Sequence, residues 1–215
     1  IISNTSKTIV GNVDKIKLTL AAIISEGSIL IEDYPGSGKT TFAKAITSSL
    51  GLNFKRIQFT SDLLPSDVLG FNILSDDKLK FQKGPIFTNI VLADELNRGS
   101  PKAQSAFLEA MEEKNVTIDG ESYNLPEPFF VIATQNPMDT SGTSSLPDSQ
   151  LDRFMISYSL SDLDQKEKIL MLKKNISFSN SASETINWSQ INDKKNEITI
   201  NCLLYTSDAA DDIPG

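Results

Sequence analysis

Apolar and polar positions follow two different periods along this chain, and together they predict strands that alternate with helices. Residues 29–31, 89–93 and 129–134 are continuous apolar runs, each followed by polar residues. Such short runs are typical of strands that are buried on both faces of a parallel sheet. Residues 54–60 alternate between polar and apolar, and residues 13–24 carry apolar side chains at helical spacing. The pattern therefore predicts an α/β fold.

The segment ILIEDYPGSGKTTFAKAI, residues 29–46, predicts a strand, a glycine-bearing loop and the start of a helix. This is the context of a phosphate-binding loop, in which backbone amides and a helix N-terminus point at the phosphates. Lys39 would reach the β- and γ-phosphates, and the Thr40 hydroxyl would hold Mg²⁺. Asp33 stands where the G-x-x-x-x-G-K-[ST] pattern has its first glycine. The alternative interpretation of the whole segment is a chance glycine turn before a helix. The candidate nucleotide-binding residues of this loop are Pro35, Gly36, Ser37, Gly38, Lys39, Thr40 and Thr41.

A second candidate site follows the apolar run at residues 89–93, where Asp94 and Glu95 are adjacent. Ligands of open α/β sheets bind at the carboxyl ends of the strands. Asp94 is therefore a candidate nucleotide-site and Mg²⁺ residue, and Glu95 a candidate for polarising the attacking water. Two carboxylates in a solvated turn are the alternative, which is less favoured downstream of a phosphate loop.

Seven segments, in this order, resemble a known family: LIEDYPGSGKT, RIQFTSDLLPSDVLGF, GPIFTNIVLADELNR, SPKAQSAFLEAMEE, VTIDG, LPEPFFVIATQNP and LPDSQLDRF. They extend from about Val10 to Phe154, and the chain resembles a MoxR-type AAA+ ATPase. The resemblance implies a P-loop NTPase fold, a three-layer sandwich around a parallel five-stranded sheet, followed by the start of an α-helical lid.

The resemblance also implies two catalytic residues beyond Glu95. Asn136 matches the family's sensor 1, although asparagine before proline is also a common turn signal. Arg153 matches the arginine finger, which would act on ATP bound to the next subunit. A surface salt bridge of Arg153 with Asp152 or Asp148 is the alternative. Arg98 is a second arginine near the site, with a weaker claim to direct contact.

The domain organisation follows from the same resemblance. Residues 1–160 would form the ATPase core, with an insert in helix 2 at about 65–83 and a pre-sensor hairpin at about 114–126. Both would project toward a central pore or a partner. The alternative for the insert is an irregular surface loop, and the alternative for the pre-sensor hairpin is an ordinary surface hairpin. Residues 161–201 would begin the lid, and the family's second sensor arginine cannot be assigned to any residue.

Residues 202–215 change character, from an Asn-, Lys- and Ile-rich chain to CLLYTSDAADDIPG. We interpret them as a non-native or disordered tail, because they resemble translated sequencing-adapter read-through. A divergent flexible tail is the alternative. The nucleotide sequence that encodes these residues distinguishes the two interpretations, since a homologous gene that continues through them would refute the read-through hypothesis.

The composition of the chain restricts which metal ligands and which partners it can have. The 215 residues include no histidine and one cysteine, so a metal must be held by oxygen atoms. The formal net charge of −8 argues against broad nucleic-acid binding and disfavours a nucleic-acid motor. No apolar run approaches the ~20 residues of a membrane span, and a cytoplasmic protein is expected.

The resulting prediction is an enzyme that binds ATP and Mg²⁺ and hydrolyses ATP between the subunits of a ring, expected to be a hexamer. By resemblance, it would remodel or mature a client protein, together with a partner that carries a von Willebrand factor A domain. A nucleotide-dependent binding scaffold with little turnover is the alternative.

Overall fold

The computed structural model describes residues 2, 5, 6, 9, 12–34, 36–75, 78–137, 146–161 and 188–196. Of the predicted site residues, Pro35 lies outside this set. The predicted lid is described only at residue 161 and residues 188–196, and the predicted tail at 202–215 lies entirely outside it.

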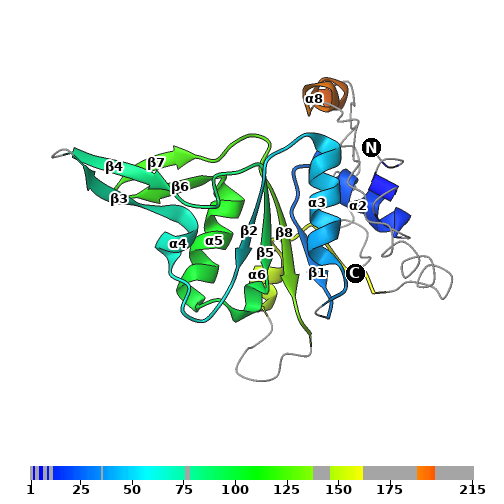
Figure 1. Cartoon of the computed structure of the whole chain (residues 1–215), viewed down its shortest axis with the longest axis horizontal. Helices are drawn as coiled ribbons and strands as arrows, with labels where there is room; N and C mark the ends of the chain where they lie inside the picture. Colours follow the sequence, from blue (N-terminus) through cyan, green and yellow to red (C-terminus); the bar gives the residue numbers. More distant parts are fainter. Residues whose placement is uncertain are drawn as a thin grey trace, which may run out of the picture.

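A five-stranded sheet forms the centre of the molecule, with the strand order β2-β5-β8-β1-β9 (Figure 1). Every neighbouring pair is parallel, and Gln58 of β2 stands opposite Asp94 of β5 in the register. The predicted parallel sheet is confirmed. The strands are β1 (Ile29–Glu32), β2 (Phe54–Gln58), β5 (Ile90–Asp94), β8 (Phe130–Gln135) and β9 (Ile156–Tyr158).

Helices cover both faces of this sheet, which makes three layers (Figure 1). Helices α2 (Val13–Ile24) and α3 (Lys39–Leu50) pack on one face, and α4 (Pro65–Leu69) and α5 (Pro101–Glu113) on the other. The predicted helix at 13–24 matches α2. The predicted three-layer α/β sandwich is confirmed.

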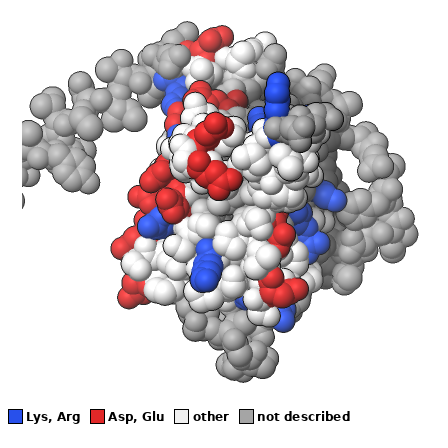
Figure 2. Space-filling model, turned by 90° about the vertical axis from the view of Figure 1, so that its left-hand side faces the viewer, with Lys and Arg blue, Asp and Glu red and all other residues white. Residues whose placement is uncertain are grey.

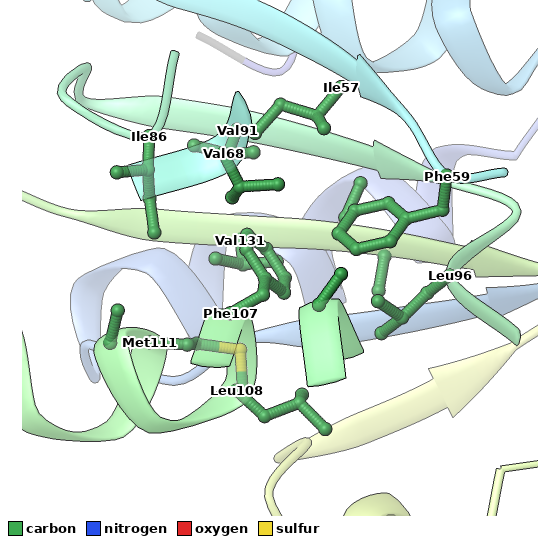
Figure 3. Packing of buried hydrophobic residues seen from close by; sticks show 14 of the residues in the cluster. Ile57, Phe59, Val68, Ile86, Val91, Leu96, Phe107, Leu108, Met111 and Val131 are labelled. Carbon is green, nitrogen blue, oxygen red and sulfur yellow. The ribbon is translucent and has the colours of Figure 1, made fainter. Parts of the chain in front are cut away.

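Two hydrophobic clusters fix the sheet between its helices. Val91 and Ala93 of β5 belong to the cluster on the α5 side, whereas Ile90 and Leu92 belong to the cluster on the α3 side. All of β5 is buried, which explains why its sequence is a continuous apolar run. Figure 3 shows the α5 side, where Phe107 meets side chains of the sheet.

The predicted insert at 65–83 is an ordered element rather than an irregular loop. Helix α4 is followed by strands β3 (Gly70–Ser75) and β4 (Lys78–Lys83), which pair as an antiparallel hairpin. Strands β6 (Asn115–Ile118) and β7 (Glu121–Asn124) form a second hairpin. Asp119 and Gly120 at its turn have φ values of 51° and 85°, the left-handed conformations that a two-residue Asp-Gly turn requires.

The two hairpins lie side by side and extend away from the sheet (Figure 1). The rings of Phe81 and Tyr123 stack at 4.1 Å between centroids, and Asn72 Nδ2 donates to Asp119 Oδ2 at 2.7 Å. Figure 2 looks onto this end of the molecule, where acidic side chains are most numerous along one side and Lys and Arg side chains are scattered among uncharged residues. Whether the hairpins face a pore stays a prediction, as do the domain boundaries.

The remaining described elements are short. A 3₁₀ turn, η1 (Leu96–Arg98), precedes α5, α6 (Asp148–Leu151) precedes β9, and α8 (Trp188–Asn196) is the last described helix. Within the described ranges, no helix is long and apolar enough to cross a membrane.

Candidate functional site

Predicted site residues from three segments gather at one edge of the sheet, because three parallel strands end there. The glycine loop follows β1, Asp94 and Glu95 lie at the end of β5, and Asn136 follows β8. β8 lies between the other two strands. The sheet therefore brings together segments that lie about sixty and a hundred residues apart in the sequence.

The loop between β1 and α3 turns at two glycines in left-handed conformations. Gly36 has a φ of 84° and Gly38 a φ of 88°, values that glycine adopts without a steric penalty. Lys39 begins α3, and no side chain caps this helix start. The first backbone N–H groups of the helix have no partner within the helix and are available to an anion.

Lys39 reaches back across the mouth of this loop. Its Nζ donates to the backbone carbonyls of Asp33 at 2.9 Å and Tyr34 at 2.8 Å. Burial lowers the pKa of Lys39 below its usual value, although the nearby carboxylates of Asp33, Asp94 and Glu95 oppose this shift. The ammonium group thus lies among carboxylates at the loop, where an incoming phosphate could replace the two carbonyls.

Asp33, the departure from the glycine pattern, is 1% exposed. Its carboxylate accepts hydrogen bonds from Tyr34 N at 2.8 Å, from Leu160 N at 3.0 Å and from the Ser161 hydroxyl. Burial alone would raise the pKa of Asp33, but the hydrogen bonds from Ser161 and from the backbone outweigh burial and hold the pKa below its usual value. The residue is therefore a buried anion held by neutral donors.

Asp94 is 7% exposed, and both of its carboxylate oxygens are engaged. Thr134 Oγ1 on β8 donates to Oδ1 at 2.7 Å. Arg56 on β2 donates to Oδ2 twice, from Nε at 3.0 Å and from Nη2 at 2.5 Å. Asp94 therefore lies in a polar network between two neighbouring strands and not in a solvated turn.

Glu95 is held by the same network. Its φ is 54°, and its backbone N–H donates to Thr134 Oγ1 at 2.9 Å. Its Oε2 accepts from Gln58 Nε2 at 2.9 Å and from Arg98 Nη1 at 2.9 Å. The side chain of Glu95 is 25% exposed, so its carboxylate remains accessible. Arg98, which the sequence made a weaker candidate, thus contacts a predicted catalytic carboxylate directly.

Asn136 and Arg153 differ in their surroundings. Asn136 is half-buried directly after β8, at the same sheet edge as Asp94. Arg153 lies against α5, where its Nη1 contacts Glu112 Oε2 at 2.5 Å and donates to the Leu108 carbonyl at 3.3 Å. The ion pair of Arg153 is therefore made with Glu112, on a neighbouring helix, and the alternative partners Asp152 and Asp148 were wrong.

Comparison with known proteins places this arrangement in a family. Residues 28–156 match the model of the ATPase family associated with various cellular activities (AAA). The chain is 53% identical over 156 residues to the uncharacterised protein YeaC of Bacillus subtilis (strain 168), covering 72% of this chain and 49% of that protein. It is 41% identical over 151 residues to Chaperone MoxR1 of Mycobacterium tuberculosis (strain ATCC 25618 / H37Rv), covering 69% of this chain and 40% of that protein. The chain belongs to the MoxR family of AAA+ ATPases.

A crystal structure agrees with this family. A candidate ATPase from Cytophaga hutchinsonii ATCC 33406 superposes with a TM-score of 0.80 at 38% identity, covering 91% of this chain and 61% of that one. The chain spans about half the length, or less, of the two curated relatives reported above. Membership of an ATPase family implies nucleotide binding, and the uncapped start of α3 at Lys39 is the candidate site for the phosphates.

The donor set fits Mg²⁺ in this MoxR-type chain. Mg²⁺ is usually held by one or two protein oxygens, with substrate phosphates and water completing its shell. Thr40 in the first turn of α3 and Asp94 at the end of β5 supply such oxygens. In the part of the chain that the structure covers, no group of three or more His, Cys, Asp or Glu side chains could form a metal site by itself.

Three polar residues of this network were not predicted from the sequence: Arg56, Gln58 and Thr134. Arg56 and Gln58 alternate with apolar residues along β2, so both lie on one face of that strand. That alternation was visible in the sequence, but its meaning depends on the pairing of β2 with β5. Thr134 follows four apolar residues of β8, and a fully buried hydroxyl there indicates a polar partner.

Proposed function

We propose that this chain is the ATP-hydrolysing core of a MoxR-type remodelling factor. The convergence of Lys39, Asp94 and Glu95 at one sheet edge supports the proposal, because Lys39 belongs to the segment that follows β1 whereas Asp94 and Glu95 lie at the end of β5. Two acidic side chains beside a lysine and a helix N-terminus suit phosphoryl transfer, which depends on positioning and on electrostatic stabilisation.

Each group has a role in this proposal. Gly36 to Thr41 bind the phosphates through backbone N–H groups, and Lys39 moves from the loop carbonyls to the β- and γ-phosphate oxygens. Thr40 and Asp94 hold Mg²⁺, which supplies charge neutralisation when bound. Glu95 accepts a hydrogen bond from the attacking water and orients it, and Asn136 positions the water or the γ-phosphate from β8.

The assembly belongs to the same proposal. Arg153 lies on the surface, with its side chain 36% exposed, so a neighbouring subunit could bring its own Arg153 to this chain's ATP. A ring, expected to be a hexamer, would follow from that shared site. MoxR1 is named a chaperone, which supports protein remodelling as the output. A client protein, a von Willebrand factor A domain partner and a cytoplasmic location are further parts of the proposal.

Nucleotide binding and phosphate release together test this function. Lys39→Ala should abolish binding of a fluorescent ATP analogue, since the charge that meets the phosphates is lost. Glu95→Gln keeps the size of the side chain but removes the negative charge, so ATP should stay bound while turnover falls at least roughly a hundredfold. Unchanged affinity in Lys39→Ala would refute the loop assignment. Binding without turnover in the wild type would favour the scaffold alternative.

A mixing experiment tests the shared site. In a version of the protein that spans the whole length of its relatives, Arg153→Ala and Lys39→Ala should each be inactive alone. Mixed rings contain some interfaces with both an intact loop and an intact Arg153, so partial turnover should return. Arginines of this kind raise the catalytic rate on the order of 10³-fold or more in related phosphoryl-transfer systems. Demonstrated mixed assembly without recovery would refute a role in trans.

A further inference from the structure

Asp33 connects the phosphate loop to a distant part of the chain. It occupies the first position of the loop, directly after β1, and it is 1% exposed. Its carboxylate accepts hydrogen bonds from Leu160 N at 3.0 Å and from the Ser161 hydroxyl, residues that lie 127 and 128 positions later in the sequence. A glycine at this position could make neither contact.

Leu160 is held from a second side as well. Asn12 Nδ2, directly before α2, donates to the Leu160 carbonyl at 3.2 Å. The Leu160 side chain is 3% exposed and packs in the α3-side hydrophobic cluster. Both backbone polar groups of Leu160 therefore have partners, one on the phosphate loop and one at the start of α2. The chain is fixed at this point as it leaves β9.

The backbone of Asp33 faces the proposed phosphate site. Its carbonyl accepts from Lys39 Nζ at 2.9 Å, while its N–H donates to Gln135 O at 3.1 Å. One residue thus contacts the phosphate-binding lysine through its main chain and residues 160 and 161 through its side chain. Lys39 and Leu160 are therefore hydrogen-bonded to the same residue, Asp33.

We propose that Asp33 is a positioning residue that couples occupancy of the phosphate loop to the chain segment leaving β9. The inference rests on the proposed function, because it requires a nucleotide phosphate to draw Lys39 away from the Asp33 carbonyl. The loop then rests on the phosphates through its own amides. The Asp33 carboxylate moves with the loop. As a result, its hydrogen bonds hold residues 160 and 161 more firmly when nucleotide is bound.

The partners of Asp33 explain why an ionised carboxylate serves this purpose. Three donors converge on its two oxygens, and a carboxylate offers about four lone-pair sites where an amide offers one accepting oxygen. Asp33→Asn should therefore keep part of the coupling, and Asp33→Gly, which restores the common loop pattern, should lose all of it. Ser161→Ala removes only one donor.

Amide hydrogen exchange of peptides covering residues 155–161 tests the proposal, with and without saturating ADP. In the wild type, ADP should slow exchange at Leu160 at least about threefold, because local opening depends on how firmly the loop is held. In Asp33→Gly, basal exchange there should rise at least roughly tenfold, as expected for the loss of a charged hydrogen bond, and the ADP effect should vanish. Asp33→Asn should fall between the two.

Glu32→Gln is the matched control. Glu32 is the neighbouring carboxylate and also accepts a hydrogen bond from the β9 side, from Ser157 Oγ at 2.6 Å, but this contact is exposed and lies one residue before the loop. The ADP effect at Leu160 should persist in this variant. If Asp33→Gly fails to fold, Asp33→Asn and Ser161→Ala still test the coupling, since each should weaken the ADP effect.

A separate titration of ADP binding distinguishes the two levels of failure. If the wild type does not bind ADP, the proposed function and the coupling are both overturned. If the wild type binds ADP and Leu160 exchange does not change, or changes equally in Asp33→Gly, the coupling alone is overturned. Equal loss of the ADP effect in Glu32→Gln would reduce Asp33 to a general structural role.

Discussion

Two buried aspartates at the same edge of the sheet are held in different ways. Asp33, after β1, is 1% exposed, and its oxygens accept from two backbone N–H groups and one hydroxyl. Asp94, at the end of β5, is 7% exposed and accepts from a hydroxyl and from the Arg56 guanidinium. The first carboxylate has only neutral donors, whereas the second has a cation.

The difference shows which carboxylate is ready to exchange its partner. The main-chain donors of Asp33 are fixed by the fold, so its contacts can change only if the loop or residues 160 and 161 move. Arg56 is a long side chain that is 48% exposed, and it can swing into solvent without disturbing the sheet. Asp94 thus has a replaceable cation where Mg²⁺ is proposed to bind, whereas Asp33 keeps its partners unless the loop or residues 160 and 161 move.

Replacing each carboxylate by an amide should give the largest contrast between the two aspartates, and the contrast should appear in ATP turnover. Asp94→Asn weakens the proposed Mg²⁺ shell, so ATP turnover should fall at least roughly a hundredfold, because a bound metal contributes several kcal/mol to such reactions. Asp33→Asn should have a much smaller effect, since one accepting oxygen remains. Phosphate release at saturating Mg²⁺ measures both. Similar losses in the two variants would end the functional distinction between these aspartates.

Thr134 lets the comparison be made on stability. Its buried hydroxyl donates to Asp94 and accepts the Glu95 N–H, so Thr134→Val leaves two polar groups without that partner. The free energy of unfolding should fall by about 2 kcal/mol, as for other unsatisfied buried groups. Thr134→Ser, which keeps the hydroxyl, is the control in urea denaturation. Ser161→Ala, which removes an exposed donor from Asp33, should cost clearly less, and a larger cost there would reverse the comparison.

Arg56→Met tests whether the cation beside Asp94 is replaceable. The change should lower the free energy of unfolding by only about 1 kcal/mol, since ion pairs with a half-exposed partner are screened by water. It should also lower the Mg²⁺ concentration needed for tight ATP binding, because no guanidinium competes for Asp94. Arg56→Lys keeps a positive charge without the planar fork and should lie between the two. A rise in the Mg²⁺ requirement would indicate that Arg56 supports metal binding.

Much of the sheet and both strand-end motifs could be predicted because their signals are local. The apolar runs that end at Asp94 and Asn136 are continuous, and the glycine loop carries its own pattern. Boundaries shifted by a residue or two: the run at 54–60 ends as a strand at Gln58. Phe59 and Thr60 remain outside the strand, although Phe59 packs its ring 5.2 Å from that of Phe107.

The partners of these motifs could not be predicted because they depend on long-range register. Arg56 meets Asp94 only because β2 pairs with β5 so that Gln58 stands opposite Asp94. Asp33 was visible as a departure from the loop pattern, but its partners Leu160 and Ser161 are set by the pairing of β1 with β9. Arg153 meets Glu112 for the same kind of reason, because the end of α6 lies against α5.

Glu26 is an exposed carboxylate held by two lysines, and its replacement should have the smallest effect on the free energy of unfolding. Glu26 accepts from Lys114 Nζ and Lys195 Nζ, each at 2.5 Å, and these hydrogen bonds lower its pKa from 4.5 to about 2. Since the folded-state pKa is lowered, the stabilisation is present above pH 4.5 and is lost as the pH falls from there toward 2. The side chain is 49% exposed, so water and salt screen the pairs and the contribution should stay below about 1 kcal/mol. Urea denaturation of the wild type and Glu26→Gln at pH 7 and pH 3.5 should show a small difference that shrinks at the lower pH and in 1 M salt, as expected for screened charges. A difference that grows on acidification would mean that the lysines do not stabilise this carboxylate, and that its position between α2 and β1 depends on packing alone.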